Sequence, residues 1–167
     1  DELEQFLHDQ SVVGAAAWNR LFDETMASLQ FNVDEEVLNL EATLNLLSDT
    51  NRETREKGTR ALIKVFRENI SLFSRITNTL AKDKEVEDRW RKMPTPQFSR
   101  HLANQVEPEV VEALRDAVVA AYPKISHRYY ALKAKWLGFD TLEVWDRNAP
   151  LDSDNSSDIQ WEEAKKR

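Results

Sequence analysis

Three histidines, His8, His101 and His127, are the side chains of this chain best suited to proton transfer or metal binding. Zinc-dependent hydrolysis of the His-Glu-x-x-His type needs two imidazoles four residues apart on one helix, with a glutamate beside the first imidazole as general base. The histidines here are 93 and 26 residues apart, so no two of them share a helix face. The sequence also lacks cysteine, a Gly-x-Ser-x-Gly nucleophile motif and a glycine-rich phosphate loop. The residues therefore predict no self-contained active site, with no catalytic and no metal-ligating residue.

A calcium-binding pattern near the end of the sequence is a second candidate for chemistry. Residues 152–163 place oxygen-bearing side chains at the spacing of an EF-hand loop, from Asp152 to Glu163. The glycine that makes the sharp turn of such a loop is replaced by Ser157, and Pro150 ends any incoming helix. A polar linker is therefore the preferred interpretation of this segment.

The most informative segment is SHRYYALKAKWLGFDTLEVWDRNAP, at residues 126–150. Its helical part carries an apolar stripe at one-turn intervals, consisting of Ile125, Tyr129, Leu132 and Trp136. A second apolar strip, from Tyr130 and Leu137, lies beside the first, so the helix is apolar over most of its circumference. This pattern predicts a helix in the middle of the domain with Trp136 buried, ended by Gly138 in a left-handed conformation.

The same segment resembles the oligoendopeptidase F family, zinc metallopeptidases related to thimet oligopeptidase. The resemblance rests on HRYYALKAKWLG, followed after a short gap by WDRNAPL. It extends upstream to AAWNRLFDET, ITNTLAKDKE and RHLANQVEPEVVEAL, and downstream to IQWEEAK. Such enzymes carry their chemistry in a His-Glu-x-x-His helix, which this sequence lacks. The resemblance therefore implies a helical N-terminal lobe over residues 1–150, and at 151–167 a linker with the start of the segment leading to an absent catalytic lobe.

The family also implies a function. The complete enzyme would hydrolyse internal bonds of short peptides with a zinc-activated water. Zinc would be bound by the missing catalytic part, and no cofactor by this chain, which alone is expected to be inactive. The helical lobe would form one wall of the substrate channel, so its partners would be its own catalytic lobe and, in the complete enzyme, short peptides. The alternative is a non-enzymatic helical scaffold, or protein-interaction domain, that binds a partner through its apolar faces.

Two groups of residues are candidates for these roles. The candidate channel wall consists of Arg128, Tyr129, Tyr130 and Lys133. Their hydroxyls and cations could hold the carbonyls and C-terminal carboxylate of a peptide, or the basic side chains could lie over an aromatic core with their charges in water, which is the preferred interpretation. The candidate lobe junction consists of Trp145, Asp146, Arg147, Asn148 and Trp161. Its three polar members could instead fix the segment that leaves the helix.

The remaining pattern predicts an all-α, multi-helix domain with one long helix and one small β-hairpin at most. A helix capped by Ser11 is expected at 12–29, followed by the hairpin around residues 34–36 and a short helix at 41–47. A capping box beginning at Thr50 starts the long helix, which spans 52–92 with a bend near 81–84.

Three further helices are expected in the second half. One starts at Thr95-Pro96, and one starts at Pro108 and packs antiparallel to the helix of residues 126–137. A last one is expected at 159–166.

Composition limits the classes of function. Hydrophobic residues make up 41% and charged residues 32% of the 167 residues, as in a soluble single domain. No apolar run has the length of a membrane span, and neither a signal peptide nor cysteine is present, so no membrane association and a cytoplasmic location are expected.

The net charge of −7 is unevenly distributed. Residues 1–50 sum to −10 and residues 51–92 to +5, and the bases of the second segment alternate with acids. This arrangement is typical of solvated helix faces rather than a phosphate-binding patch, so nucleic-acid binding is not expected. Electrostatic attraction between residues 1–50 and residues 51–92 is expected instead.

Overall fold

The computed structural model describes residues 1–151 and 161–165 of the chain. The helices there are α1 (Glu2–Val13), α2 (Ala15–Ser28), α3 (Leu40–Asn45), α4 (Arg52–Glu68), α5 (Ile70–Trp90), α6 (Phe98–Asn104), α7 (Pro108–Ala121), α8 (Ser126–Trp136) and α9 (Trp161–Ala164). The described residues also form the 3₁₀ helices η1 (Leu46–Ser48), after α3, and η2 (Val144–Asp146), after α8. The strand β1 (Phe31–Val33) pairs antiparallel with β2 (Glu36–Leu38). The predicted all-α class with one small hairpin is confirmed. None of the described helices is long and apolar enough to cross a membrane.

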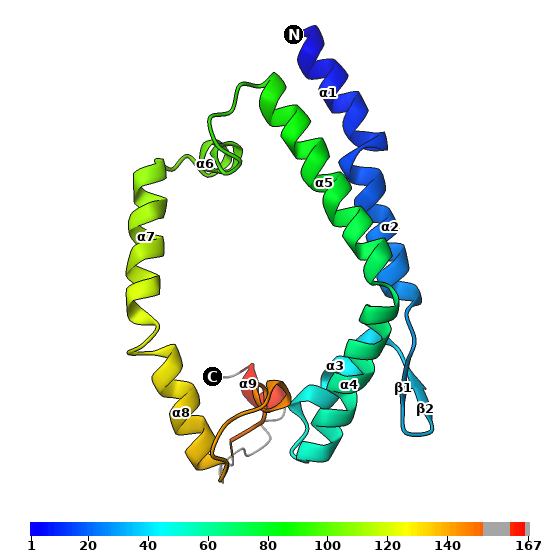
Figure 1. Cartoon of the computed structure of the whole chain (residues 1–167), viewed down its shortest axis with the longest axis vertical. Coiled ribbons are helices and arrows are strands. Elements are labelled where there is room, and N and C mark those ends of the chain that lie inside the picture. Colours follow the sequence, from blue (N-terminus) through cyan, green and yellow to red (C-terminus); the bar gives the residue numbers. More distant parts are fainter. Residues whose placement is uncertain (152–160, 166–167) are drawn as a thin grey trace.

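The helices follow an open ring (Figure 1). On one side α1 and α2 run beside α5, and α4 continues below them with α3 and the hairpin. On the other side α6, α7 and α8 form an arm, after which η2 returns to pack against α4. The arm is therefore held at both ends, by its chain connection to α5 and by the contact between η2 and α4.

The apolar core lies where α2, β1, α3, α4 and the start of α5 meet. Phe31 is completely buried there, with Leu29, Ala61 and Leu62 around it. Three rings stack edge to face: Phe31 lies 5.9 Å from Phe66, which lies 6.1 Å from Phe73. Aromatic pairs in this geometry add stabilisation beyond the area they bury. The hairpin is thus tied to α4 by its first residue.

Two of the predicted helix boundaries are wrong. Ser11 lies inside α1, where its hydroxyl donates to the carbonyl of His8 instead of capping a helix, and the break falls at Gly14. The long helix divides at Asn69 rather than near 81–84, because the Asn69 side-chain amide donates to the Val65 carbonyl and its backbone leaves the helical region. An asparagine that bonds to a neighbouring carbonyl competes with the helical ladder.

The predicted cap at Thr50 is also wrong by one residue. The Asn51 side chain accepts a hydrogen bond from the Glu53 amide at 2.8 Å and is the N-cap of α4. Replacing an N-cap asparagine by alanine leaves that amide unsatisfied. We therefore expect Asn51→Ala to lower the free energy of unfolding by about 1 kcal/mol, measured from urea midpoints. Thr50→Ala is the matched control, and an equal loss from both variants would contradict the assignment.

The predicted central position of the helix at residues 126–137 is wrong as well. Within α8 only Lys133 and Ala134 are buried, and Trp136 is 60% exposed. The helix α7 has no buried residue and continues into α8 along the arm instead of packing antiparallel to it (Figure 1). Periodicity identifies which helix faces are apolar, but it does not specify what covers them.

The predicted helix start at Thr95-Pro96 is wrong, because these residues lie in the turn before α6, which begins at Phe98. Several other local predictions agree with the structure. A short helix follows the hairpin, Pro108 is the first residue of α7, and Gly138 has a positive φ of 75°. The uneven charge does join the first two segments, since Arg91 pairs with Glu4 at 2.6 Å and Lys57 pairs with Asp34 at 3.1 Å. Both pairs are partly exposed, so each contributes at most about 1 kcal/mol.

Candidate functional site

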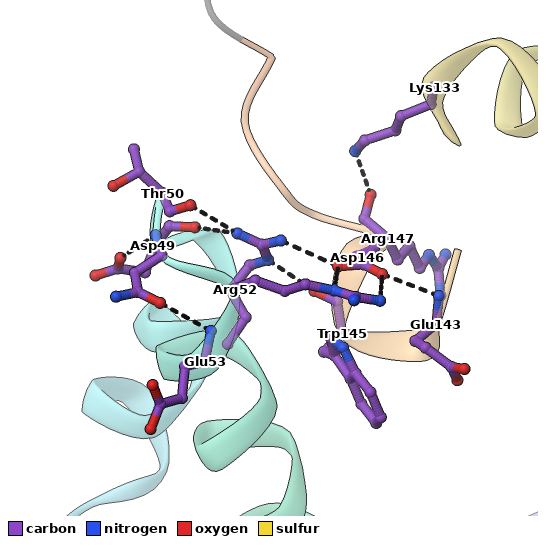
Figure 2. A network of polar contacts seen from close by, with 11 residues as sticks. Asp49, Thr50, Arg52, Glu53, Lys133, Glu143, Trp145, Asp146 and Arg147 are labelled. Carbon is purple, nitrogen blue, oxygen red and sulfur yellow. Dashed lines mark hydrogen bonds and ion pairs between the residues drawn. The ribbon is translucent and has the colours of Figure 1, made fainter. Parts of the chain in front are cut away.

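A buried carboxylate holds the end of the arm against α4. Asp146, in η2, is fully buried and accepts four hydrogen bonds (Figure 2). Oδ1 accepts from Arg52 Nε and Arg55 Nη2, both at 3.0 Å. Oδ2 accepts from Arg52 Nη2 at 2.7 Å and from the Glu143 amide at 3.0 Å. All the lone-pair sites of the carboxylate are therefore used.

The two arginines come from the first turn of α4 and differ in environment. Arg55 is only 3% exposed, and besides Asp146 it donates to the carbonyls of Trp145, Asp49 and Thr50 at 2.9–3.0 Å. These bonds fix both the loop before α4 and the segment that follows α8. The guanidinium of Arg52 is partly exposed and lies 4.0 Å from the ring centroid of Phe139. That contact is within the range of a cation–π interaction.

The surroundings of Asp146 also set its protonation. Burial alone would raise the pKa of this carboxyl, but the hydrogen bonds from Arg52, the Glu143 amide and Arg55 hold its pKa below the ordinary value. The folded state therefore favours the charged form of Asp146.

This shift predicts how stability depends on pH. A carboxyl whose pKa is lowered in the folded state stabilises the fold at pH values above its pKa in the unfolded chain, which is about 3.9. This contribution is lost as the pH falls through the pKa of the folded state. We expect the free energy of unfolding of the wild type to drop more between pH 5 and pH 3 than that of Asp146→Asn, which cannot titrate at this position. Urea unfolding at several pH values measures the difference, and parallel curves for the two proteins would contradict it.

Lys133 forms a second tether between α8 and η2. Its ammonium is buried and donates to the Arg147 carbonyl at 2.7 Å (Figure 2). Desolvation and the charge of Arg55 lower the pKa of Lys133. The side chain thus neither lies over an aromatic core with its charge in water nor presents that charge at the surface.

A pocket of about 710 Å³ lies beside these tethers, between α8 and the segment that leads to η2. Tyr130, Ala131 and Ala134 form its helical wall, and residues 140–144 with Arg147 form the opposite wall. Its volume lies within the range of about 300–1,000 Å³ that ligand pockets have. Among the lining residues, Tyr130 and Thr141 have hydroxyl groups and Arg147 has a guanidinium, whereas Asp140 and Glu143 have carboxylates. The hydroxyls and the guanidinium are groups that can donate hydrogen bonds to the carbonyls of a polar chain.

The structure brings together only some of the candidate residues. Tyr130 and Arg147 line the pocket, whereas Lys133 and Asp146 are buried in the tethers next to it. The others lie around this region: Arg128, Tyr129 and Asn148 are exposed, Trp145 is half-buried, and Trp161 on α9 is 70% exposed. The predicted polar linker and calcium pattern at 152–158 lie outside the described residues.

Sequence reasoning missed the most constrained residue of the region, Arg55. The alternation of bases and acids predicted a solvated face, yet Arg55 is buried and bound to a carboxylate 91 positions away. No local pattern distinguishes it from the neighbouring exposed bases.

The described residues do not fit a zinc ion. His8, His101 and His127 lie on α1, α6 and α8 respectively. Within residues 1–151 and 161–165 no three side chains of histidine, cysteine, aspartate or glutamate are grouped to hold a metal ion.

Comparisons with known proteins show which family this chain resembles. A family model described as Oligopeptidase F matches residues 1–31. Oligopeptidase PepF of Bacillus subtilis (strain 168) is 28% identical over 123 residues, which are 73% of this chain and 18% of PepF. The crystal structure of oligoendopeptidase-F from Enterococcus faecium shares the fold, with a TM-score of 0.78 and 22% identity over 90% of this chain and 30% of that one. The chain thus spans under a third of either relative. The family model over residues 1–31 and the partial match to PepF make this chain similar to an N-terminal part of the oligoendopeptidase F family, and the solved structure shows a shared fold.

Proposed function

We propose that this chain is the helical substrate-channel lobe of an oligoendopeptidase F-like zinc metalloendopeptidase that hydrolyses short peptides. In this proposal the zinc ion and the catalytic residues belong to the remainder of the protein. The arm of α6, α7 and α8 forms part of the channel wall, with Tyr130 and Arg147 available to peptide carbonyls or carboxylates. A narrow channel would admit short flexible peptides and exclude folded proteins.

The observation that carries the proposal is the apolar surface of the arm. Leu114 on α7 is 64% exposed and Trp136 on α8 is 60% exposed, although both lie in regular helices, and Ile125, just before α8, is 66% exposed. Large apolar side chains that stay exposed at several positions along one arm favour an interaction surface. The tethers at Asp146 and Lys133 hold this surface in place, as a wall of a binding channel requires.

The first experiment compares residues 1–167 with the complete gene product. Quenched-fluorescent peptides of increasing length are the substrates, and metal content is measured on both proteins. We expect zinc and peptide hydrolysis in the complete protein and neither in residues 1–167, because the histidines here share no site. Turnover by residues 1–167, or a complete sequence without His-Glu-x-x-His, would contradict the proposal and favour a non-enzymatic scaffold.

A substitution on the arm tests its role within the complete protein. Leu114→Asp should leave the stability of residues 1–167 within about 0.5 kcal/mol of the wild type, because this side chain is exposed there. In the complete protein it should lower peptidase activity, since it places a charge on a covered or substrate-facing surface. Glu112→Ala, on the same helix, is the control. Full activity of Leu114→Asp would show that the arm has no such role.

A further inference from the structure

A second apolar groove lies away from the candidate site, between α1 and the second half of α5. Its volume is about 370 Å³. Leu3, Phe6 and Leu7 line it from α1, and Val86 and Trp90 from α5. Phe6 and Trp90 are each 61% exposed, although both belong to regular helices. The groove therefore offers an aromatic and aliphatic surface that no described residue covers.

One carboxylate in this groove is without a partner among the described residues. Asp83 lines the groove and is half-buried where α5 approaches the break between α1 and α2. A Cβ atom on Gly14 would lie 3.2 Å from its Oδ1, a tight contact from which the carboxylate would have to shift slightly. The neighbouring acids differ: Glu85 pairs with Lys82 and Asp88 pairs with Lys84. Asp83 forms no such pair within the described residues, and a half-buried carboxylate gains free energy from a cationic partner.

The charge of the groove selects the kind of occupant. Glu87 also lines it, and no lysine or arginine does. Arg91, just after α5, is already bound to Glu4 and Glu87. A second copy of this chain would bring its own acidic α1 to the groove, and residues 1–50 sum to −10, so self-association is opposed by like charges. A basic partner is favoured.

The shape of the groove indicates a helix. Its α1 wall extends from Leu3 to Ser11 and its α5 wall from Asp83 to Trp90, which corresponds to about two turns of helix on each side. An amphipathic helix binds such a groove through apolar side chains at positions i, i+3, i+4 and i+7. We propose that the groove between α1 and α5 binds a basic amphipathic helix of a partner protein. The apolar residues of that helix contact Phe6 and Trp90, and a lysine or arginine beside them pairs with Asp83.

The test uses the 167-residue chain and two synthetic helical peptides. Both carry leucines at i, i+3, i+4 and i+7, flanked by lysines in one peptide and by glutamates in the other. Calorimetric titration should show binding of the lysine peptide only. Because a hydrogen bond to a charged group contributes roughly 1.5–3 kcal/mol, Asp83→Asn should weaken this binding by about tenfold or more.

Asp23→Asn is the matched control, because it changes the net charge equally at an exposed position of α2 outside the groove. It should leave the affinity unchanged, whereas Phe6→Ala should reduce it. Equal weakening by Asp23→Asn and Asp83→Asn would show attraction to net charge alone and overturn the proposal. Equal binding of both peptides, no binding of either, or dimerisation of the chain through this groove would overturn it as well.

Discussion

Asp146→Ala is expected to lower the free energy of unfolding by about 3–5 kcal/mol, the usual cost of removing one partner from a buried ion pair. The reason is Arg55, which is almost fully buried and would keep its charge without the carboxylate that neutralises it. The Glu143 amide would lose its acceptor at the same time. Urea unfolding at neutral pH measures the loss.

Two comparisons separate this effect from a general loss of charge. Asp116→Ala removes a carboxylate that pairs with Arg115 on the surface, and it should change stability by less than about 1 kcal/mol. A triple replacement of Arg52 and Arg55 by Met and of Asp146 by Leu should recover most of the loss, since buried ion clusters can be replaced by apolar side chains of similar volume. A small effect of Asp146→Ala alone would mean that water reaches Arg55 once the carboxylate is gone.

Phe31→Ala is expected to be equally destabilising, at about 3–5 kcal/mol, because it creates a cavity in the centre of the core. Phe31 is completely buried, and it joins the hairpin to α4 through its edge-to-face contact with Phe66. Thermal unfolding and urea unfolding both measure the change.

Phe6→Ala is the matched control, with the same atoms removed from an exposed position on α1. It should change stability by less than about 0.5 kcal/mol. A comparable loss from both variants would indicate that the unfolding transition reports on the α1–α5 side of the ring as much as on the core.

The two substitutions have different consequences for function. Phe31 lies in the body of the domain, whereas Asp146 ties the C-terminal end of the arm to that body. Loss of Asp146 should therefore loosen α8 and the pocket beside Tyr130 before the core unfolds. If the arm is a channel wall, this variant should impair peptide hydrolysis in the complete protein more than its loss of stability alone would.

Much of the local structure follows from short-range physical rules that can be read from the sequence. Apolar residues at three- and four-residue spacing identified the helices, Pro108 marked the start of α7, and Gly138 marked the left-handed end of α8. These features depend on backbone sterics and on neighbours within one turn, so no distant contact is needed to specify them. The family resemblance was likewise carried by contiguous motifs.

Contacts between distant segments were decided by the tertiary structure alone. Arg55 and Asp146 are 91 positions apart, and nothing near either residue distinguishes it from an exposed arginine or aspartate. The stripe that includes Trp136 predicted a central helix, but in the folded chain α8 lies on an open arm. A periodic apolar face requires a covering partner, but it does not specify which segment that partner is. The burial of a side chain depends on the segments that pack against it, and these are set by the tertiary fold of the whole chain.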